Sequence, residues 1–320
     1  MSIWMKKTAL LLVLFVVIGV GGCGGAKQAE NKNAFAVIAD DSGRQVELKQ
    51  RPQRIVVLST SLLETLYAAG GQAVGKPNSR NAPPISGTEN LPEIGYVYNV
   101  NTEQILGLKP DLVIGFQGIH EKLVPLFEGS HIPVLLLKIK TYDDLKRQIA
   151  LLGRIAGSET QAEAVVGAME EQLKTVQNKL PEQGKKIVIL HATAKSVTVE
   201  LENSVAGNIA ALLKLRNIAS GSSPIETGGD MTPYSLEKLV ASDPDLVLVV
   251  TMGSNTADIE KRMRQDVSDN PAWSSLRAVK DGRIVFLPSE LFQLNPGLQF
   301  PEAVKYLAKE VYPEVYGNAR

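Results

Sequence analysis

The sequence predicts an α/β protein in which two αβ lobes are joined by one long helix. A segment at residues 103–114 recurs at residues 237–248, and in each copy a glutamate lies seven residues ahead of Pro-Asp-Leu-Val. A basic residue, Arg54 or Lys186, opens an apolar stretch about 50 residues ahead of each glutamate. Each half is therefore expected to contain a buried strand and, later, a short helix, a sharp turn and a second strand.

The long helix is predicted between the two copies. Apolar residues recur every three or four positions from Ala162 to Leu180, and Pro181 ends the pattern. Ser158 with Gln161 is expected to cap its start, which gives a helix of ~22 residues and ~33 Å. We therefore divide the chain into an N-terminal αβ lobe at residues 35–157, a connecting helix at 158–181 and a C-terminal αβ lobe at 182–320.

The N-terminal lobe is expected to begin with a hairpin, because apolar residues alternate over residues 35–48 around a turn sequence at 40–43. The apolar run at 55–58 predicts a buried strand, and residues 61–69 predict a helix that a glycine pair ends. A loop at 77–100, rich in proline, asparagine, glycine and serine, precedes the first repeat. A strand is expected at 134–137, and Thr141 with Asp144 predicts a capping box for the next helix.

The C-terminal lobe is expected to follow a similar order. A strand at 187–190, a helix at 206–213 and a glycine-rich loop at 224–232 precede the second repeat. A helix at 259–267, a short turn, a strand at 284–287 and a closing helix at 301–311 follow it.

Length and charge limit the kind of partner. A chain of 320 residues fits two domains, because single cores stop growing near ~250 residues. Lysine plus arginine and aspartate plus glutamate are equal at 34 each, so no net charge attracts nucleic acid.

The first residues predict export and a lipid anchor. Lys6 and Lys7 precede an apolar run at 8–20 that is too short to span a membrane, and Cys23 is the only cysteine of the chain. This start resembles a bacterial lipoprotein signal, which implies that residues 1–22 are removed and that Cys23 carries lipid at the extracytoplasmic face of the cell membrane. Residues 23–34 then form a flexible tether. The alternative is a plain signal peptide with an incidental cysteine.

The lipoprotein start, the hairpin before Arg54, the two repeats and the long middle helix together resemble substrate-binding lipoproteins of ABC importers for ferric siderophores, haem and cobalamin. The resemblance covers residues from about 35 to 316. It implies two Rossmann-like αβ lobes, one rigid connecting helix and a ligand cleft between the lobes, without enzymatic activity. It also implies an iron or cobalt chelate as ligand and, as partner, an ABC permease dimer with a cytoplasmic ATPase.

Glu103 and Glu237 match the two acids that, in this family, project from opposite lobes and meet arginines of the permease dimer. Two carboxylates held apart by a rigid helix can engage two symmetry-related arginines bidentately. The alternative is that each is only a first-turn acid, which the helix dipole favours by ~0.3 to 1 kcal/mol.

The ligand is expected beyond the carboxyl ends of the strands, where doubly wound sheets bind their ligands. The loops there are rich in aromatic, amide and hydroxyl side chains, and Arg80 is the only basic residue in the nominated N-terminal loops. This favours a hydroxamate, citrate-type, haem or cobalamin ligand over a strongly anionic catecholate. The alternative for each candidate is loop packing. The candidate contacts are Ser61, Tyr98, Phe116, Gln117, Tyr234, Met252 and Phe292.

No metal site or resident cofactor is expected. The three histidines, His120, His131 and His191, lack metal-ligand spacing, and His191 is predicted to be packed or hydrogen-bonded. A lipid-anchored hydrolase using Ser59 or Ser61 with His191 is a remote alternative, because the chain has no Gly-x-Ser-x-Gly elbow. A surface adhesion or sensor protein on the same scaffold is a further alternative, which a neighbouring permease would argue against.

Overall fold

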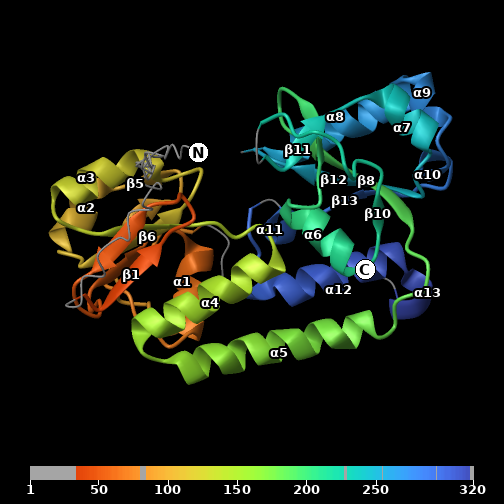
Figure 1. The fold of residues 1–320 in the computed structure, drawn as a ribbon. Helices are drawn as coiled ribbons and strands as arrows, with labels where there is room; N and C mark the ends of the chain where they lie inside the picture. The colour runs from red at the N-terminus through yellow and green to blue at the C-terminus, as the bar shows by residue number, and fades with distance from the viewer. Residues whose placement is uncertain (1–33, 80–83, 227–228, 254, 293, 318–320) are drawn as a thin grey trace, which may run out of the picture.

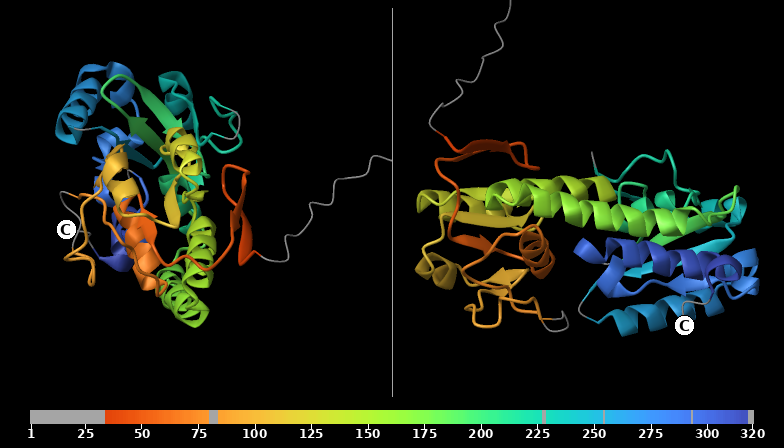
Figure 2. Two further views of the ribbon diagram at one scale, coloured as in Figure 1. Left: turned by 90° about the vertical axis from the view of Figure 1, so that its left-hand side faces the viewer. Right: turned by 90° about the horizontal axis from the view of Figure 1, so that it is seen from below.

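A computed structural model describes residues 34–79, 84–226, 229–253, 255–292 and 294–317, which form a mixed α/β fold with two main sheets. In Figure 1 the elements of the N-terminal half lie on one side and those of the C-terminal half on the other, while α5 (Glu159–Gln177) runs beneath. In the view from below in Figure 2, α5 extends from the first half to the second. Cys23 lies outside the described residues.

The N-terminal half contains a parallel sheet of three strands in the order β3-β6-β7. Its strands are β3 (Ile55–Val57), β6 (Leu112–Phe116) and β7 (Val134–Leu137). The hairpin expected before them is formed by β1 (Ala36–Ala39) and β2 (Gln45–Leu48). The other elements are α1 (Thr60–Ala68), β4 (Gly95–Tyr96), β5 (Asn99–Val100), α2 (Thr102–Gly107), η1 (Glu121–Leu123), α3 (Val124–Gly129) and α4 (Tyr142–Ala156).

The C-terminal sheet has the order β11-β9-β8-β12-β13, and β10 pairs with β8. Its strands are β8 (Lys186–Ala192), β9 (Val197–Glu200), β10 (Arg216–Asn217), β11 (Met231–Pro233), β12 (Leu246–Thr251) and β13 (Ile284–Phe286). The helices are α6 (Val205–Leu212), α7 (Leu236–Ser242), α8 (Thr256–Asp269), α9 (Pro271–Ser274), α10 (Arg277–Lys280), α11 (Ser289–Phe292), η2 (Gly297–Gln299), α12 (Phe300–Val311) and α13 (Pro313–Tyr316).

Two local predictions have opposite outcomes. The capping box of α4 is confirmed, because Thr141 accepts from the main-chain N–H of Asp144 at 3.0 Å and Asp144 accepts from that of Thr141 at 3.0 Å. The predicted cap at Ser158 is wrong, since its side chain makes no capping bond. Gln161, its expected partner, instead donates to the carbonyl of Ala68 at 2.9 Å. That bond fastens α5 to the end of α1.

The two repeats have matching turns between helix and strand. The residue six positions after each glutamate, Lys109 or Asp243, has a left-handed backbone with φ of 48° or 41°. The aspartate of Pro-Asp-Leu-Val, Asp111 or Asp245, accepts a bond of 2.8 Å from the main-chain N–H of the basic residue that opens the neighbouring strand. The resemblance between the two segments therefore extends to backbone geometry and hydrogen bonding.

The basic residues also hold the acid-bearing helices. The Arg54 guanidinium donates to the carbonyl of Leu108 after α2 at 2.7 Å, and the Lys186 ammonium donates to the carbonyl of Ser242 at the end of α7 at 2.9 Å. The last carbonyls of a helix lack partners within the helix, so a cation there satisfies them and interacts favourably with the helix dipole. α2 is thus fastened to the start of β3 and α7 to the start of β8.

One hydrophobic cluster is continuous through both halves. It includes one face of each main sheet together with buried residues of α4, α5 and α12. The rings of Tyr142 on α4 and Phe300 on α12 lie 5.4 Å apart inside it. Gln177 at the end of α5 donates to the carbonyl of Leu212 on α6 at 3.2 Å. Within the described ranges, no helix has both the length and the apolar character needed to cross a membrane.

Candidate ligand-binding cleft and docking acids

A cleft of about 1110 Å³ lies between the two halves. The N-terminal half contributes the first turns of α1 and residues 78–79, 84–86, 96–97 and 116, and the C-terminal half contributes residues 289–290, 294–296 and 298–299. The volume slightly exceeds the usual range of about 300 to 1,000 Å³ for small-molecule sites. A large ligand would therefore touch both halves at once.

The N-terminal wall lies beyond the carboxyl ends of β3 and β6. Ser59 follows β3, and its hydroxyl accepts from the main-chain N–H of Leu62 at 3.2 Å, which starts α1 at the wall. Phe116 ends β6 and also lines the cleft. This wall thus lies at the strand ends, where the rule for parallel sheets predicts a ligand.

The C-terminal wall approaches α1 closely at a turn before α12. Asn295 accepts from the main-chain N–H of Gly297 at 2.9 Å. Gly297 has a φ of 54°, and a Cβ built on it would lie 3.4 Å from the Cβ of Ser61. A glycine permits both this left-handed backbone and the close approach of the two halves at the cleft.

His120 contacts the main chain of two residues of the N-terminal wall. The main-chain N–H of Phe116 donates to its Nδ1 at 2.8 Å, and its Nε2 lies 2.8 Å from the carbonyl oxygen of Val97. This pair of contacts requires a neutral imidazole with its proton on Nε2. Burial lowers the pKa of His120, which favours the same neutral form.

Lowering the pH should decrease the free energy of unfolding because His120 becomes protonated. Because the folded state lowers the pKa of this imidazole, the unfolded chain binds the proton first as the pH falls. The contribution of His120 to the free energy of unfolding is therefore full above about pH 6.5 and is lost below it, with a slope of at most about 1.4 kcal/mol per pH unit. Urea unfolding of the wild type and of His120→Gln, measured at several pH values between about 8 and 5, tests this.

His131 supplies the control for this measurement. It is exposed and has a left-handed φ of 61°, which asparagine tolerates. His131→Asn should keep the slope of the wild type, whereas His120→Gln should flatten it. Equal slopes in the wild type and His120→Gln would show that the imidazole does not act in this way.

Of the seven candidate contacts, Ser61 and Phe116 line the cleft. Tyr98 is 66% exposed and is not among its lining residues. Gln117 is half-buried beyond the end of β6, where its main-chain N–H donates to Leu137 at 2.9 Å. Arg80 falls outside the described residues. Ligand contact by these residues stays a prediction.

The candidates of the C-terminal half lie elsewhere. Tyr234 lines a separate hollow with Trp273, within the smaller core cluster of that half. Phe292 is 2% exposed and packs 6.1 Å from the ring of Tyr306. Met252 is half-buried after β12 and is not among the lining residues of the cleft. The structure therefore places Tyr234 and Phe292 in packing positions, because aromatic rings near strand ends also fill the core.

Several cleft residues were not predicted. Glu64 lies in the second turn of α1, where the sequence gives no sign of which helix face meets the other half. Asn78 and Asn295 come from the loops before β4 and η2, and Gln299 is the last residue of η2. The turn sequence Asn-Pro-Gly at 295–297 was the available signal, because such a turn before a helix marks a loop with a fixed shape.

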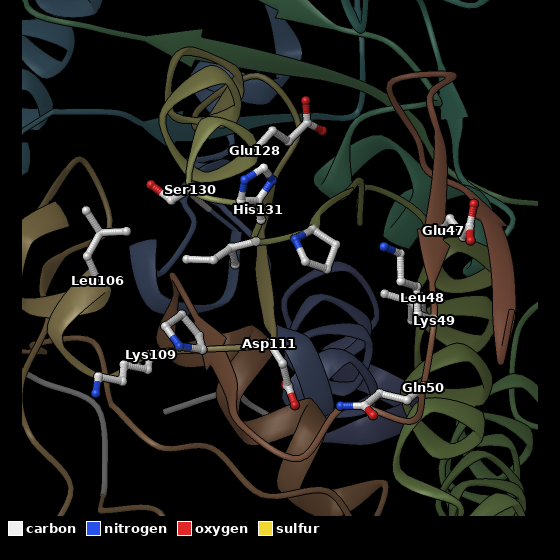
Figure 3. A pocket seen from close by; sticks show the side chains of 13 residues that line it. Glu47, Leu48, Lys49, Gln50, Leu106, Lys109, Asp111, Glu128, Ser130 and His131 are labelled. Atoms are coloured by element: carbon white, nitrogen blue, oxygen red, sulfur yellow. The ribbon is translucent and has the colours of Figure 1, made fainter.

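A second hollow of about 740 Å³ lies at the opposite, amino ends of β6 and β7 (Figure 3). Two of its acidic side chains already have partners. Asp111 accepts from the main-chain N–H groups of Gln53 and Arg54 at 2.8 Å each, and Glu128 pairs with Arg44 at 2.8 Å. All of its lining residues belong to the N-terminal half, whereas both halves line the cleft.

The predicted docking acids lie on the surface of opposite halves. Glu103 is in the first turn of α2 and Glu237 in the first turn of α7, and both are exposed. Figure 1 shows α2 and α7 far apart and both away from α5. No hydrogen bond or ion pair engages either carboxylate within the described part of the chain.

The serines and the histidine considered for a hydrolase lie in different halves. His191 Nδ1 lies 2.8 Å from the carboxylate of Glu200, and both side chains are buried in the C-terminal half. Ser59 caps α1 in the other half. Among the described residues, no three histidine, cysteine, aspartate or glutamate side chains gather as metal ligands would. The prediction that His191 is hydrogen-bonded is confirmed.

Comparisons with known proteins agree with this architecture. A family model described as periplasmic binding protein matches residues 55–291. The putative ABC transporter substrate-binding lipoprotein YhfQ of Bacillus subtilis is 24% identical over 312 residues, which are 94% of this chain and 96% of YhfQ. The Fe(3+)-citrate-binding protein YfmC of the same organism is 24% identical over 327 residues, or 98% of each chain.

The fold is also found among solved structures. Staphylococcus aureus IsdE, crystallised with heme, has a TM-score of 0.71 and 21% identity, and the match covers 81% of this chain and 98% of IsdE. At this identity the likeness shows the fold alone. The family model, however, matches most of the chain, so the protein belongs to the periplasmic binding protein family, the substrate-binding proteins of ABC importers, and is not an enzyme.

Proposed function

We propose that this protein captures an iron chelate or a related metal chelate outside the cytoplasm and delivers it to an ABC permease. The observation that carries the proposal is the cleft of about 1110 Å³, which both halves line. One relative is named as an Fe(3+)-citrate-binding protein, and a solved structure of similar fold contains heme. A haem or cobalamin ligand in the same cleft is the alternative.

The lining supports a chelate ligand. Hydroxyl and amide side chains come from both walls, including Ser61, Asn78, Asn295 and Gln299. Aromatic rings of Tyr67, Tyr96 and Phe116 lie among those that line the cleft. A few polar groups that fix orientation, placed among apolar and aromatic surfaces, are typical of sites for organic ligands.

The two halves are expected to move little on binding. The shared core cluster and the bonds of α5 to α1 and α6 would all have to be disturbed by a large hinge motion. Packed interfaces of this kind resist continuous deformation. Recognition therefore depends on a cleft that is largely formed before the ligand arrives.

The membrane side of the proposal rests on three residues. Cys23 carries lipid and keeps the protein near the permease, while Glu103 and Glu237 bind arginines of two permease subunits. Exposed carboxylates without partners are suited to this role, because they lose no internal bond on docking. The ATPase on the cytoplasmic side then drives uptake of the chelate.

Direct titration tests the proposal. The purified protein should bind at least one of four ligand classes saturably: ferric hydroxamates, ferric citrate, haem or cobalamin. Tyr67 and Tyr96 line the cleft, so a coloured chelate bound there should quench tyrosine fluorescence. Failure of all four classes to bind would remove the proposed function.

A further inference from the structure

The described lining of the cleft is acidic. Its two charged residues are Glu64 on α1 and Glu290 on α11, and it contains no lysine or arginine. The N-terminus of α1 adds a partial positive charge of only about half an elementary charge. The described walls therefore carry a net negative charge, with one carboxylate contributed by each half.

Glu64 has no partner among the residues that the structure describes. Within the described part of the chain, no hydrogen bond or ion pair holds its carboxylate, although the side chain is half-buried. Its Oε2 lies 3.8 Å from the position of a Cβ on Gly297, so it faces the turn contributed by the opposite half. Burial raises the pKa of Glu64, which reflects the cost of removing a carboxylate from water without a compensating charge.

An unpaired donor lies on the same wall as that turn. The Nδ2 of Asn295 is buried and has no hydrogen-bond partner among the described residues, although its Oδ1 is engaged by Gly297. Buried polar groups normally have partners, so an unpaired donor beside a cleft is suited to an oxygen atom of a ligand. The lining thus offers a carboxylate for a cation and an amide for an acceptor.

We propose that the cleft selects chelates that carry a positive charge, with Glu64 meeting the cationic group and Glu290 adding to the attraction from the other wall. This inference rests on the proposed function and narrows its ligand class. A ferric trihydroxamate has a neutral core, because three hydroxamates balance the ferric ion, so a pendant ammonium makes the whole chelate cationic. Ferric citrate complexes and catecholates carry negative charge and would be repelled.

The test compares chelates that differ only in charge. The full chain, purified in detergent, is titrated with ferric desferrioxamine B, which has a free ammonium group, and with its N-acetylated, neutral derivative. Aquacobalamin, which is cationic, and cyanocobalamin, which is neutral, give the same comparison on a cobalt scaffold. Haem and ferric dicitrate are the anionic ligands. The wild type is measured beside Glu64→Gln and, as a control, Glu163→Gln, which removes an exposed acid of α5.

The wild type should bind the cationic member of at least one pair about 10-fold or more tightly than its neutral counterpart, as expected for a charge-assisted contact. Glu64→Gln should abolish that preference, and Glu163→Gln should keep it. The comparison within the wild type needs no variant, so it stands even if a substitution disturbs folding.

Two results separate the inference from the proposed function. Equal binding within each pair, a preference for haem or ferric dicitrate, or a preference that survives Glu64→Gln would overturn the charge selectivity while the receptor function stood. Absence of saturable binding for every one of these ligands would overturn both.

Discussion

Uptake of the chelate should fall by about 100-fold or more when both docking acids are reversed, in Glu103→Arg with Glu237→Arg. Close charge pairs at protein interfaces have coupling energies of about 1.5 to 7 kcal/mol, and reversal replaces attraction by repulsion at two places. Ligand affinity should change by less than about 2-fold, because both side chains are exposed and neither lines the cleft. Uptake of radioactive iron by whole cells and titration of the purified variant measure the two quantities.

A matched control uses two other acids. Glu163 and Glu171 are exposed on α5, so Glu163→Arg with Glu171→Arg makes the same change in net charge on a face away from α2 and α7. This variant should transport at the rate of the wild type. Each single reversal, Glu103→Arg or Glu237→Arg, should be intermediate. Normal uptake in the docking double variant would exclude the two acids as the permease contacts.

Replacing Phe300 by alanine should destabilise the whole molecule by about 3 to 5 kcal/mol. Phe300 is 1% exposed, begins α12 and packs against Tyr142 of α4 within the cluster that both halves share. Its loss should therefore weaken the connection between the halves as well as the core. Urea unfolding, with hydrogen exchange measured separately for amides of each half, gives both effects.

Phe127 provides the comparison. It is fully buried, but it belongs to a cluster confined to the N-terminal half. Phe127→Ala should cost a similar free energy of unfolding and leave α5 and the shared cluster intact. Phe300→Ala should instead increase exchange in both halves and broaden the unfolding transition, as expected when cooperativity is lost. If the two variants behave alike, the shared cluster does not couple the halves.

The sequence predicted elements best where burial was complete. The strand at 134–137 has the predicted bounds, and α1, α6 and α12 each begin one residue before the predicted start. The repeat also placed the glutamates in the first turns of α2 and α7. These features depend on short apolar runs and on caps, which are local properties of the chain.

The sequence did not predict elements and contacts that depend on partners far away along the chain. The antiparallel strands β9 and β11 were not expected, and residues 231–232 were assigned to a loop. β9 has only four residues, of which two are buried, so its own pattern is too short to identify it. The same limit applies to Glu64, because which helix face meets the second wall is decided by the packing of α1 against η2.

The hydrogen bonds that hold α2 and α7 to their sheets affect how loaded and unloaded copies of the protein compete for the permease. Because Arg54 and Lys186 tie each short helix to its own sheet, the spacing of the two acids is expected to be the same with or without cargo. A permease that recognises only those acids would bind unloaded copies as readily as loaded ones. Unloaded copies would then occupy entry sites, and the rate of import would follow the fraction of copies carrying cargo rather than their total number.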